Sequence, residues 1–253
     1  MTSSSASRKA KIQAATPKGR AGGNGANRVV VAAVVVVLVI AAVVTAVVLG
    51  QSDKQQATKA GGSSLPKGAA AMGAGILVNP DAPTTVPTLD LYEDFQCPIC
   101  AEFEHRFGAD IEALAEKNQV RLVVHTLSFL DDNLRNDSSN RAANGAACAA
   151  DQGKFMPYHS ANFGGQPLKE GAGYTDADLT SFAQKAGITG AALKTWQQCY
   201  DTKAHNQYVE SVQTQSEKDG VNGTPTLKLN GKTLDLKGFT AESLAAQVKA
   251  ATK

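Results

Sequence analysis

Apolar residues form one long unbroken run near the start of the chain and shorter periodic patterns after it. The run, residues 29–49, contains about 21 residues with no charge, proline or glycine. At about 1.5 Å per residue, a helix of this length spans the roughly 30 Å hydrocarbon core of a bilayer. The pattern predicts a single transmembrane helix.

The residues before this run favour an uncleaved signal anchor. Six basic residues and no acidic ones precede it: Arg8, Lys9, Lys11, Lys18, Arg20 and Arg28. By the positive-inside rule, the tail at 1–28 stays in the cytoplasm and everything after Gly50 is exported. The tail lacks aromatic residues and is expected to be disordered. Cleavage near Gly50 as a signal peptide, or burial as a core helix, is the alternative.

The distribution of charged residues agrees with a division into a cytoplasmic tail and an exported part. The chain has 25 basic and 23 acidic side chains, a formal net charge of +2. Without the six basic residues of the tail, 19 basic residues face 23 acidic ones, and the exported part carries about −4. The positive total therefore belongs to the tail and gives no argument for nucleic-acid binding.

After a predicted linker at 50–72, the patterns predict one α/β domain over residues 73–253. Apolar or alternating segments predict five strands, at 75–78, 88–95, 120–127, 226–229 and 232–236, the last two forming a hairpin around Asn230-Gly231. Apolar residues at helical spacing predict helices at 101–117, 133–150, 155–162, 176–186, 191–200 and 205–218, and another from Ala241. The order is β-α-β, a helical block, then β-β-α.

The tetrapeptide Cys97-Pro98-Ile99-Cys100 falls where the second strand ends and a helix begins. Free amides and the positive end of the helix dipole favour a thiolate at such a position. A second thiol three residues later completes the minimum apparatus for disulfide exchange. The same spacing is half of a zinc site, but Cys148 and Cys199 stand alone, without a nearby ligand. Redox chemistry is therefore favoured over zinc binding or a structural disulfide.

The other two cysteines are expected to pair with each other. If Cys97 pairs with Cys100, Cys148 remains for Cys199, and exported domains commonly use such bridges. The bridge would close a loop of about 50 residues and stabilise the fold by about 4 kcal/mol in the chain-entropy model. Two unpaired buried thiols are the alternative.

Two segments together resemble the DsbA-type thiol:disulfide oxidoreductases. They are Asp94-Phe95-Gln96-Cys97-Pro98-Ile99-Cys100 and Gly223-Thr224-Pro225-Thr226, and the resemblance covers about residues 75–250. The anchor and the extra cysteines resemble membrane-tethered DsbA-like proteins of actinobacteria. The resemblance implies a thioredoxin fold with an inserted helical subdomain at about 131–219, preceded by one transmembrane helix.

The resemblance also implies roles for individual residues. Cys97 would be the exposed nucleophile and Cys100 its buried partner. Pro225 would be a cis-proline facing them, and Thr224, Pro98 and Ile99 would contact substrate. The enterobacterial enzymes have histidine where this chain has Ile99, so we expect a less acidic Cys97 and a milder oxidant.

Proton handling departs from the family pattern. Many relatives carry an acid six residues before the first cysteine, and here that residue is Leu91. Glu93 and Asp94 are candidates for moving the proton of Cys100, although solvated or capping roles are the more ordinary interpretation. The four histidines lack ligand spacing and are interpreted as packing or surface residues. No metal or cofactor is expected.

These features predict a cell-membrane, single-pass enzyme whose extracytoplasmic domain inserts disulfides into reduced exported proteins. A tethered thiol reductase and a non-catalytic binding module of the same fold are the alternatives. In anchored relatives the electron acceptor resembles a quinone-reducing vitamin K epoxide reductase-like membrane protein, and the resemblance implies such a partner here.

Overall fold

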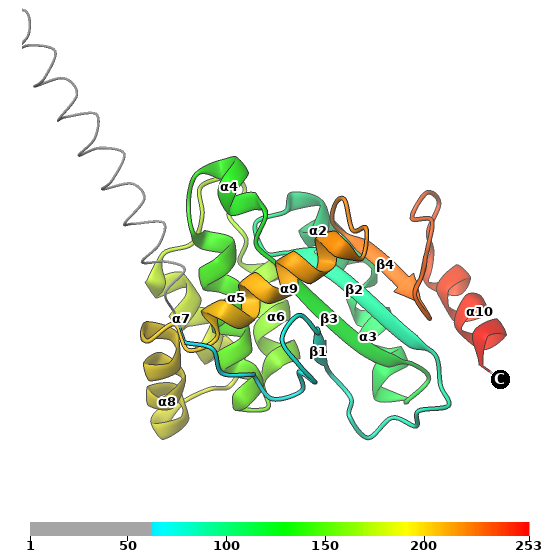
Figure 1. Cartoon of the computed structure of the whole chain (residues 1–253), viewed down its shortest axis with the longest axis horizontal. Coiled ribbons are helices and arrows are strands. Elements are labelled where there is room, and N and C mark those ends of the chain that lie inside the picture. Colours follow the sequence, from blue (N-terminus) through cyan, green and yellow to red (C-terminus); the bar gives the residue numbers. More distant parts are fainter. Residues whose placement is uncertain (1–61, 253) are drawn as a thin grey trace, which may run out of the picture. The chain divides into compact units, whose positions relative to one another are not determined.

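A computed structural model of the protein describes residues 62–252 (Figure 1). The predicted tail at 1–28, the predicted anchor at 29–49 and the first part of the predicted linker lie outside the described residues. Within residues 62–252, no helix combines the length and the apolar character that crossing a membrane requires.

Five strands form one sheet in the order β1-β3-β2-β4-β5. Their bounds are β1 Ile76–Leu77, β2 Thr88–Asp94, β3 Arg121–Leu127, β4 Thr226–Leu229 and β5 Lys232–Thr233. The central pair, β2 and β3, is parallel and in register from Thr88 opposite Arg121 to Asp94 opposite Leu127, whereas the other pairs are antiparallel. The predicted β-α-β unit and the thioredoxin-like arrangement with a helical insertion are therefore confirmed.

The hairpin at β4–β5 is shorter than predicted. Asn230 and Gly231 both have positive φ values, 49° and 78°, as a two-residue hairpin turn of the primed type requires. The second arm forms a strand only at Lys232–Thr233, and beyond it the Leu234 N–H still donates to the Leu227 carbonyl of β4 at 2.9 Å. Helix α10, Ala241–Ala251, follows and starts with a capping box at Thr240.

The predicted helix at 101–117 is three helical segments in succession. They are α2 (Pro98–Phe103), a π-helical turn η1 (Glu104–Gly108) and α3 (Ala109–Glu116). The apolar spacing does not reveal the extra residue in the turn. Short π-turns within α-helices occur frequently at functional sites.

The insertion between β3 and β4 contains six helices: α4 Leu130–Leu134, α5 Ser138–Asp151, α6 Phe155–Gly164, α7 Asp176–Lys185, α8 Gly190–Asp201 and α9 Asn206–Lys218. The predicted helix at 133–150 is two helices, because Arg135 adopts a left-handed conformation (φ 56°) and ends α4. Thr175 and Asp178 form the predicted capping box at the start of α7.

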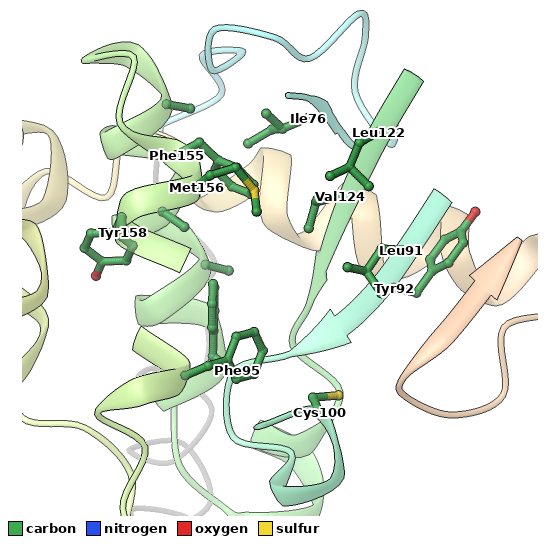
Figure 2. Packing of buried hydrophobic residues seen from close by; sticks show 14 of the residues in the cluster. Ile76, Leu91, Tyr92, Phe95, Cys100, Leu122, Val124, Phe155, Met156 and Tyr158 are labelled. Atoms are coloured by element: carbon green, nitrogen blue, oxygen red, sulfur yellow. The ribbon is translucent and has the colours of Figure 1, made fainter. Parts of the chain in front are cut away.

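The sheet and the insertion share one hydrophobic core. Figure 1 shows α9 running across the sheet, and Figure 2 shows Leu91, Leu122 and Val124 of the strands facing Phe155 and Met156 of α6. A disulfide joins Cys148 of α5 to Cys199 of α8, with 5.9 Å between the Cα atoms. The insertion is therefore packed against β2, the strand that leads into the Cys97–Cys100 motif.

Residues 62–72, assigned to the linker from sequence, pack on the domain. The Gly62 amide donates to the carbonyl of Lys203, and the Ser64 carbonyl lies 2.8 Å from Nδ1 of His205. His205 in turn pairs with Asp151 at 2.8 Å. The part of the chain that packs as a domain therefore includes residues 62–72.

Candidate active site at Cys97 and Cys100

Cys97 is the N-cap residue of α2, immediately after the turn that follows β2. Its backbone is extended (φ −76°, ψ 115°), and its N–H donates to the carbonyl of Asp94 at 2.9 Å. Pro98 occupies the first turn of the helix, where no N–H is needed and its fixed φ is already helical. Cys100 follows one turn later with no exposed surface, and the two sulfurs are unbonded in this structure.

The two thiols have opposite acidity. A hydrogen bond from Cys100 lowers the pKa of Cys97 to about 6, and the Thr224 side chain and the backbone amides of Cys100 and Ile99 add to this effect. Together these bonds outweigh burial, which alone would raise the pKa. Burial, reinforced by the bond to Cys97 and the charge of Glu93, raises the pKa of Cys100 well above its ordinary value. At neutral pH the pair is therefore a Cys97 thiolate beside a Cys100 thiol, which makes Cys97 the nucleophile and the better leaving group.

Cys97 is less accessible than we expected. Only 7% of its surface is exposed, because it sits between the start of α2 and the segment before β4. Its Sγ lies 3.6 Å from the carbonyl oxygen of Thr224, and the Thr224–Pro225 peptide bond is cis. The structure thus brings Cys97, Thr224 and Pro225 together across 127 residues of sequence.

The residues expected to meet substrate differ in exposure. Ile99 is 66% exposed, one of the few exposed large apolar side chains, and Pro98 beside it is also exposed. Thr224 and Pro225 are half-buried. An apolar surface beside a nearly covered sulfur suits an extended polypeptide more than a small, highly polar thiol.

Two side chains of the insertion hold the active-site turn, and the sequence analysis did not identify either. Gln166 donates from Nε2 to the carbonyls of Phe95 (2.7 Å) and Cys97 (3.1 Å). The Tyr174 hydroxyl donates to the same Phe95 carbonyl at 2.5 Å. Both lie about 70–80 residues from the motif, so no local pattern marks them.

Glu93 and Asp94 are both buried, which corrects the interpretation that they are solvated. Asp94 accepts hydrogen bonds from the backbone N–H groups of Gln96 and Leu130 and from the Ser139 hydroxyl. These bonds occupy both carboxyl oxygens and tie the end of β2 to the insertion. Burial nevertheless raises the pKa of Asp94 to about 7. Asp94 is thus a structural organiser of the turn before Cys97.

Glu93 lies in a buried cluster with His159 of α6 and Glu104 of η1. His159 Nε2 is 2.9 Å from Glu93 Oε2, and His159 Nδ1 is 3.8 Å from Glu104 Oε2. Burial raises the pKa of Glu93 well above its usual range and lowers that of His159. His159 therefore has a titratable hydrogen-bonding partner and is more than the packing residue we expected.

Two groups of side chains within residues 62–252 have metal-ligand character. Glu93, Glu104 and His159 form one, and Cys148, Cys199 and His205 form the other, each with ligand atoms within 4.8 Å of one another. In the second group both sulfurs are bonded to each other. Neither group includes Cys97 or Cys100, so within the described chain the motif pair has no third ligand beside it.

Comparison with known proteins finds disulfide oxidoreductases among the solved structures that share this fold. DsbA from Mycobacterium tuberculosis, in its reduced crystal structure, is 28% identical with a TM-score of 0.54, over 65% of this chain and 82% of that one. DsbG from the same organism is 29% identical with a TM-score of 0.54, over 65% and 77% of the two chains. MdbA from Corynebacterium diphtheriae shares the fold at 21% identity, with a TM-score of 0.58 over 75% and 96% of the chains.

Curated sequences give a partial match. The serine/threonine-protein kinase PknE of Mycobacterium tuberculosis is 33% identical over 119 residues, which is 44% of this chain. The chain spans about a fifth of the length of the curated relatives it matches. A family model described as Thioredoxin matches residues 75–250, more than half of the chain. The chain belongs to the thioredoxin family and is a protein disulfide oxidoreductase.

Proposed function

We propose that the protein is an oxidase that introduces disulfides into exported proteins through Cys97 and Cys100. The observation that supports this best is the asymmetry of the pair. A Cys97 thiolate stabilised by the Cys100 thiol and backbone amides favours the reduced enzyme. An oxidoreductase whose reduced form is stabilised gives up its disulfide readily and oxidises other thiols.

The reaction follows from this asymmetry. A substrate thiolate attacks Cys97 Sγ in the oxidised enzyme, and the Cys97–Cys100 bond breaks with its electron pair on Cys100, which then takes up a proton. A second substrate thiolate attacks the substrate sulfur of the mixed disulfide and releases Cys97 as a thiolate. Two electrons pass from the substrate to the cysteine pair, and a disulfide or quinone-linked acceptor must remove them before the next turnover.

The proton of Cys100 needs a nearby acceptor, because this sulfur has no exposed surface. Glu93 is the carboxyl whose charge raises the pKa of Cys100, and burial keeps Glu93 itself weakly acidic. We assign Glu93 the role of exchanging the proton with Cys100. It would do so from a position four residues before Cys97, in place of the family position that Leu91 fills with an apolar side chain.

Location and partner are part of the same proposal. Residues 29–49 anchor the enzyme, with the domain outside the cytoplasm, and the sequence pattern and the Cys148–Cys199 disulfide support this. A tethered domain meets membrane partners at a raised local concentration. A quinone-reducing membrane protein resembling vitamin K epoxide reductase is the acceptor that suits this arrangement.

The test is reactivation of a reduced, disulfide-dependent secreted enzyme by the oxidised full chain in detergent. Wild type should restore activity, Cys97→Ser should not, and Cys100→Ser should accumulate mixed disulfides. In cells, the Cys100→Ser protein should trap exported proteins together with a membrane protein. Trapped species consisting only of soluble thioredoxin-type reductants would indicate the opposite electron flow, and absence of any redox cycling would indicate a binding module.

A further inference from the structure

The buried cluster beyond Glu93 contains more titratable groups than one proton transfer needs. Glu93 contributes from β2, Glu104 from η1 and His159 from α6. Glu93 Oε1, Glu104 Oε1 and His159 Nδ1 are all buried and have no hydrogen bond of good geometry within the described residues, although the Glu93 and Glu104 carboxyls lie close enough to interact with each other. Buried polar atoms without partners are uncommon in native proteins and each calls for an explanation.

The cluster has an inner end and an outer end. Glu93 and His159 are 1% and 0% exposed, whereas the Glu104 side chain is 9% exposed. The rings of Phe95, Phe155 and Phe163 pack around His159, with centroid distances of 5.6, 5.9 and 4.9 Å. These rings separate His159 from bulk water, so Glu104 is the member of the cluster that borders the solvent.

The backbone of η1 makes room for the Glu104 carboxyl. A Cβ atom added at Gly108 would lie 2.5 Å from Glu104 Oε2, too close for the carboxyl to keep its place. Gly108 has an ordinary helical conformation (φ −54°), so a side chain there would displace the Glu104 carboxyl without straining the backbone. The π-turn therefore places the Glu104 carboxyl beside His159, and Gly108 leaves room for it there.

We propose that His159 and Glu104 form a relay that carries the proton of Cys100 between Glu93 and the solvent. A neutral imidazole accepts a proton at one nitrogen and releases one from the other. Here Nε2 lies within hydrogen-bond distance of Glu93, at 2.9 Å, whereas Nδ1 lies 3.8 Å from Glu104, so transfer at this outer step requires the Glu104 carboxyl to move closer or a water to bridge the gap. The relay rests on the proposed proton exchange at Glu93 and applies to oxidase and reductase alike.

The relay accounts for the proton that Cys100 gains and then loses in each catalytic cycle. When a substrate is oxidised, a proton moves from Glu104 to Nδ1, another leaves Nε2 for Glu93, and Cys100 receives the proton of Glu93. When the enzyme is reoxidised, each transfer runs in reverse and the proton leaves through Glu104. One complete cycle therefore returns His159 to its starting tautomer, without rotation of its tightly packed ring.

The charged and titratable groups around the cluster are consistent with this function. Besides its three members, Cys97 and Cys100 act on it from the motif, and Glu112 acts on it from α3. Burial, together with the charge of Glu93, raises the pKa of Glu104 to about 8. An outer carboxyl that gains and loses its proton near neutral pH suits exchange with water in both directions.

The experiment measures the step in which Cys100 loses its proton and closes the disulfide with Cys97. The reduced full chain in detergent is mixed with a small disulfide, and closure of the Cys97–Cys100 bond is followed by rapid quench and mass spectrometry in H2O and D2O. His159→Gln and Glu104→Gln should each slow closure by about 100-fold or more, with a larger solvent isotope effect and a changed pH profile. The matched controls are His105→Gln and Glu102→Gln, which alter exposed side chains of the same helical stretch and should behave as wild type.

Chemical rescue separates a relay from a structural role. Adding imidazole to the His159→Ala protein should accelerate closure in proportion to its concentration, and the Cys97 alkylation rate should stay unchanged. Closure of the folded Glu104→Gln protein at the wild-type rate, with the wild-type pH profile, would overturn the relay even if the His159 variants failed to fold. A Glu93→Gln protein that forms the Cys97–Cys100 disulfide at the wild-type rate would instead refute the proton role of Glu93. Failure of the secreted-enzyme assay alone would reject the oxidase direction but leave the proton roles of Glu93 and of the relay in place.

Discussion

The side-chain amide of Gln166 lies 3.1 Å from the carbonyl oxygen of Cys97, so the helical insertion directly holds the residue that carries the reactive sulfur. The same amide also holds the Phe95 carbonyl at 2.7 Å. In a thioredoxin fold the motif lies between a strand and a helix. Here the insertion adds a third support to that junction.

Removing this support should cost stability and weaken control of Cys97. Gln166→Ala removes one of two donors from each carbonyl, since Phe95 keeps the Tyr174 hydroxyl and Cys97 keeps the Ala101 N–H. We expect a loss of about 0.5–1.5 kcal/mol in the free energy of unfolding. Urea denaturation of the reduced protein measures it, with Gln184→Ala, an exposed change on α7, as control. If both variants unfold at the same urea concentration as wild type, Gln166 does not hold the turn.

The Cys97 thiolate should depend on the hydrogen bond from Cys100. The rate of Cys97 alkylation should rise with pH and reach half its plateau near pH 6, since the pKa of Cys97 is lowered to about 6. Cys100→Ala removes the donor and should move the midpoint to higher pH. Cys100→Ser keeps a hydroxyl donor and should move it less. Equal midpoints for the alanine and serine variants would mean that the backbone amides alone stabilise the thiolate.

The relative stability of the two redox forms should vary with pH. In the reduced protein, the Cys97 pKa is lower in the folded than in the unfolded chain, so the unfolded state binds more protons at intermediate pH and stability rises with pH. The melting temperature of the reduced form, minus that of the oxidised form, should therefore increase from about pH 6 to about pH 9 and be flat below this window. Calorimetry of both forms measures the difference. A difference that falls as pH rises would contradict the lowered pKa.

The Cys148–Cys199 disulfide should stabilise the protein without taking part in the reaction. It closes a 51-residue loop between α5 and α8, and replacing both cysteines with alanine should cost about 2–5 kcal/mol. Disulfide exchange at Cys97 should continue at temperatures where the variant is folded. Mild reductant should open Cys97–Cys100 before Cys148–Cys199. Loss of exchange at unchanged stability would show instead that the second pair relays electrons.

The sequence predicts the parts of the fold that depend on local pattern. A strand pattern with one buried face located β2, a nearly continuous apolar segment located β3, and Asn230-Gly231 located the hairpin. The positions of Cys97 and Cys100 at a strand-helix junction also followed from periodicity. These features depend on neighbouring residues, and neighbouring residues are what a single sequence displays.

Features that depend on distant contacts were missed. A glutamate near the end of a strand is usually solvated, and Glu93 is buried only because α6 places His159 against it, 66 residues away. Gln166 and Tyr174 donate hydrogen bonds to backbone carbonyls. Every residue has such a carbonyl, so the sequence gives no sign of these contacts. The π-turn at η1 was hidden because its apolar residues fit an ordinary helix, and Gly108 had no evident role until the Glu104 carboxyl was seen beside it.

The reduction potential of the Cys97–Cys100 pair tests the central claim most directly. Equilibrating the full chain with defined ratios of reduced and oxidised glutathione, then trapping free thiols with a mass label, gives this potential. An oxidase with a stabilised Cys97 thiolate should lie well above the roughly −270 mV of thioredoxin and below the roughly −120 mV of the strongest oxidants of this type, since Ile99 adds no positive charge. A potential at or below that of thioredoxin would contradict the oxidase account and support a reductase.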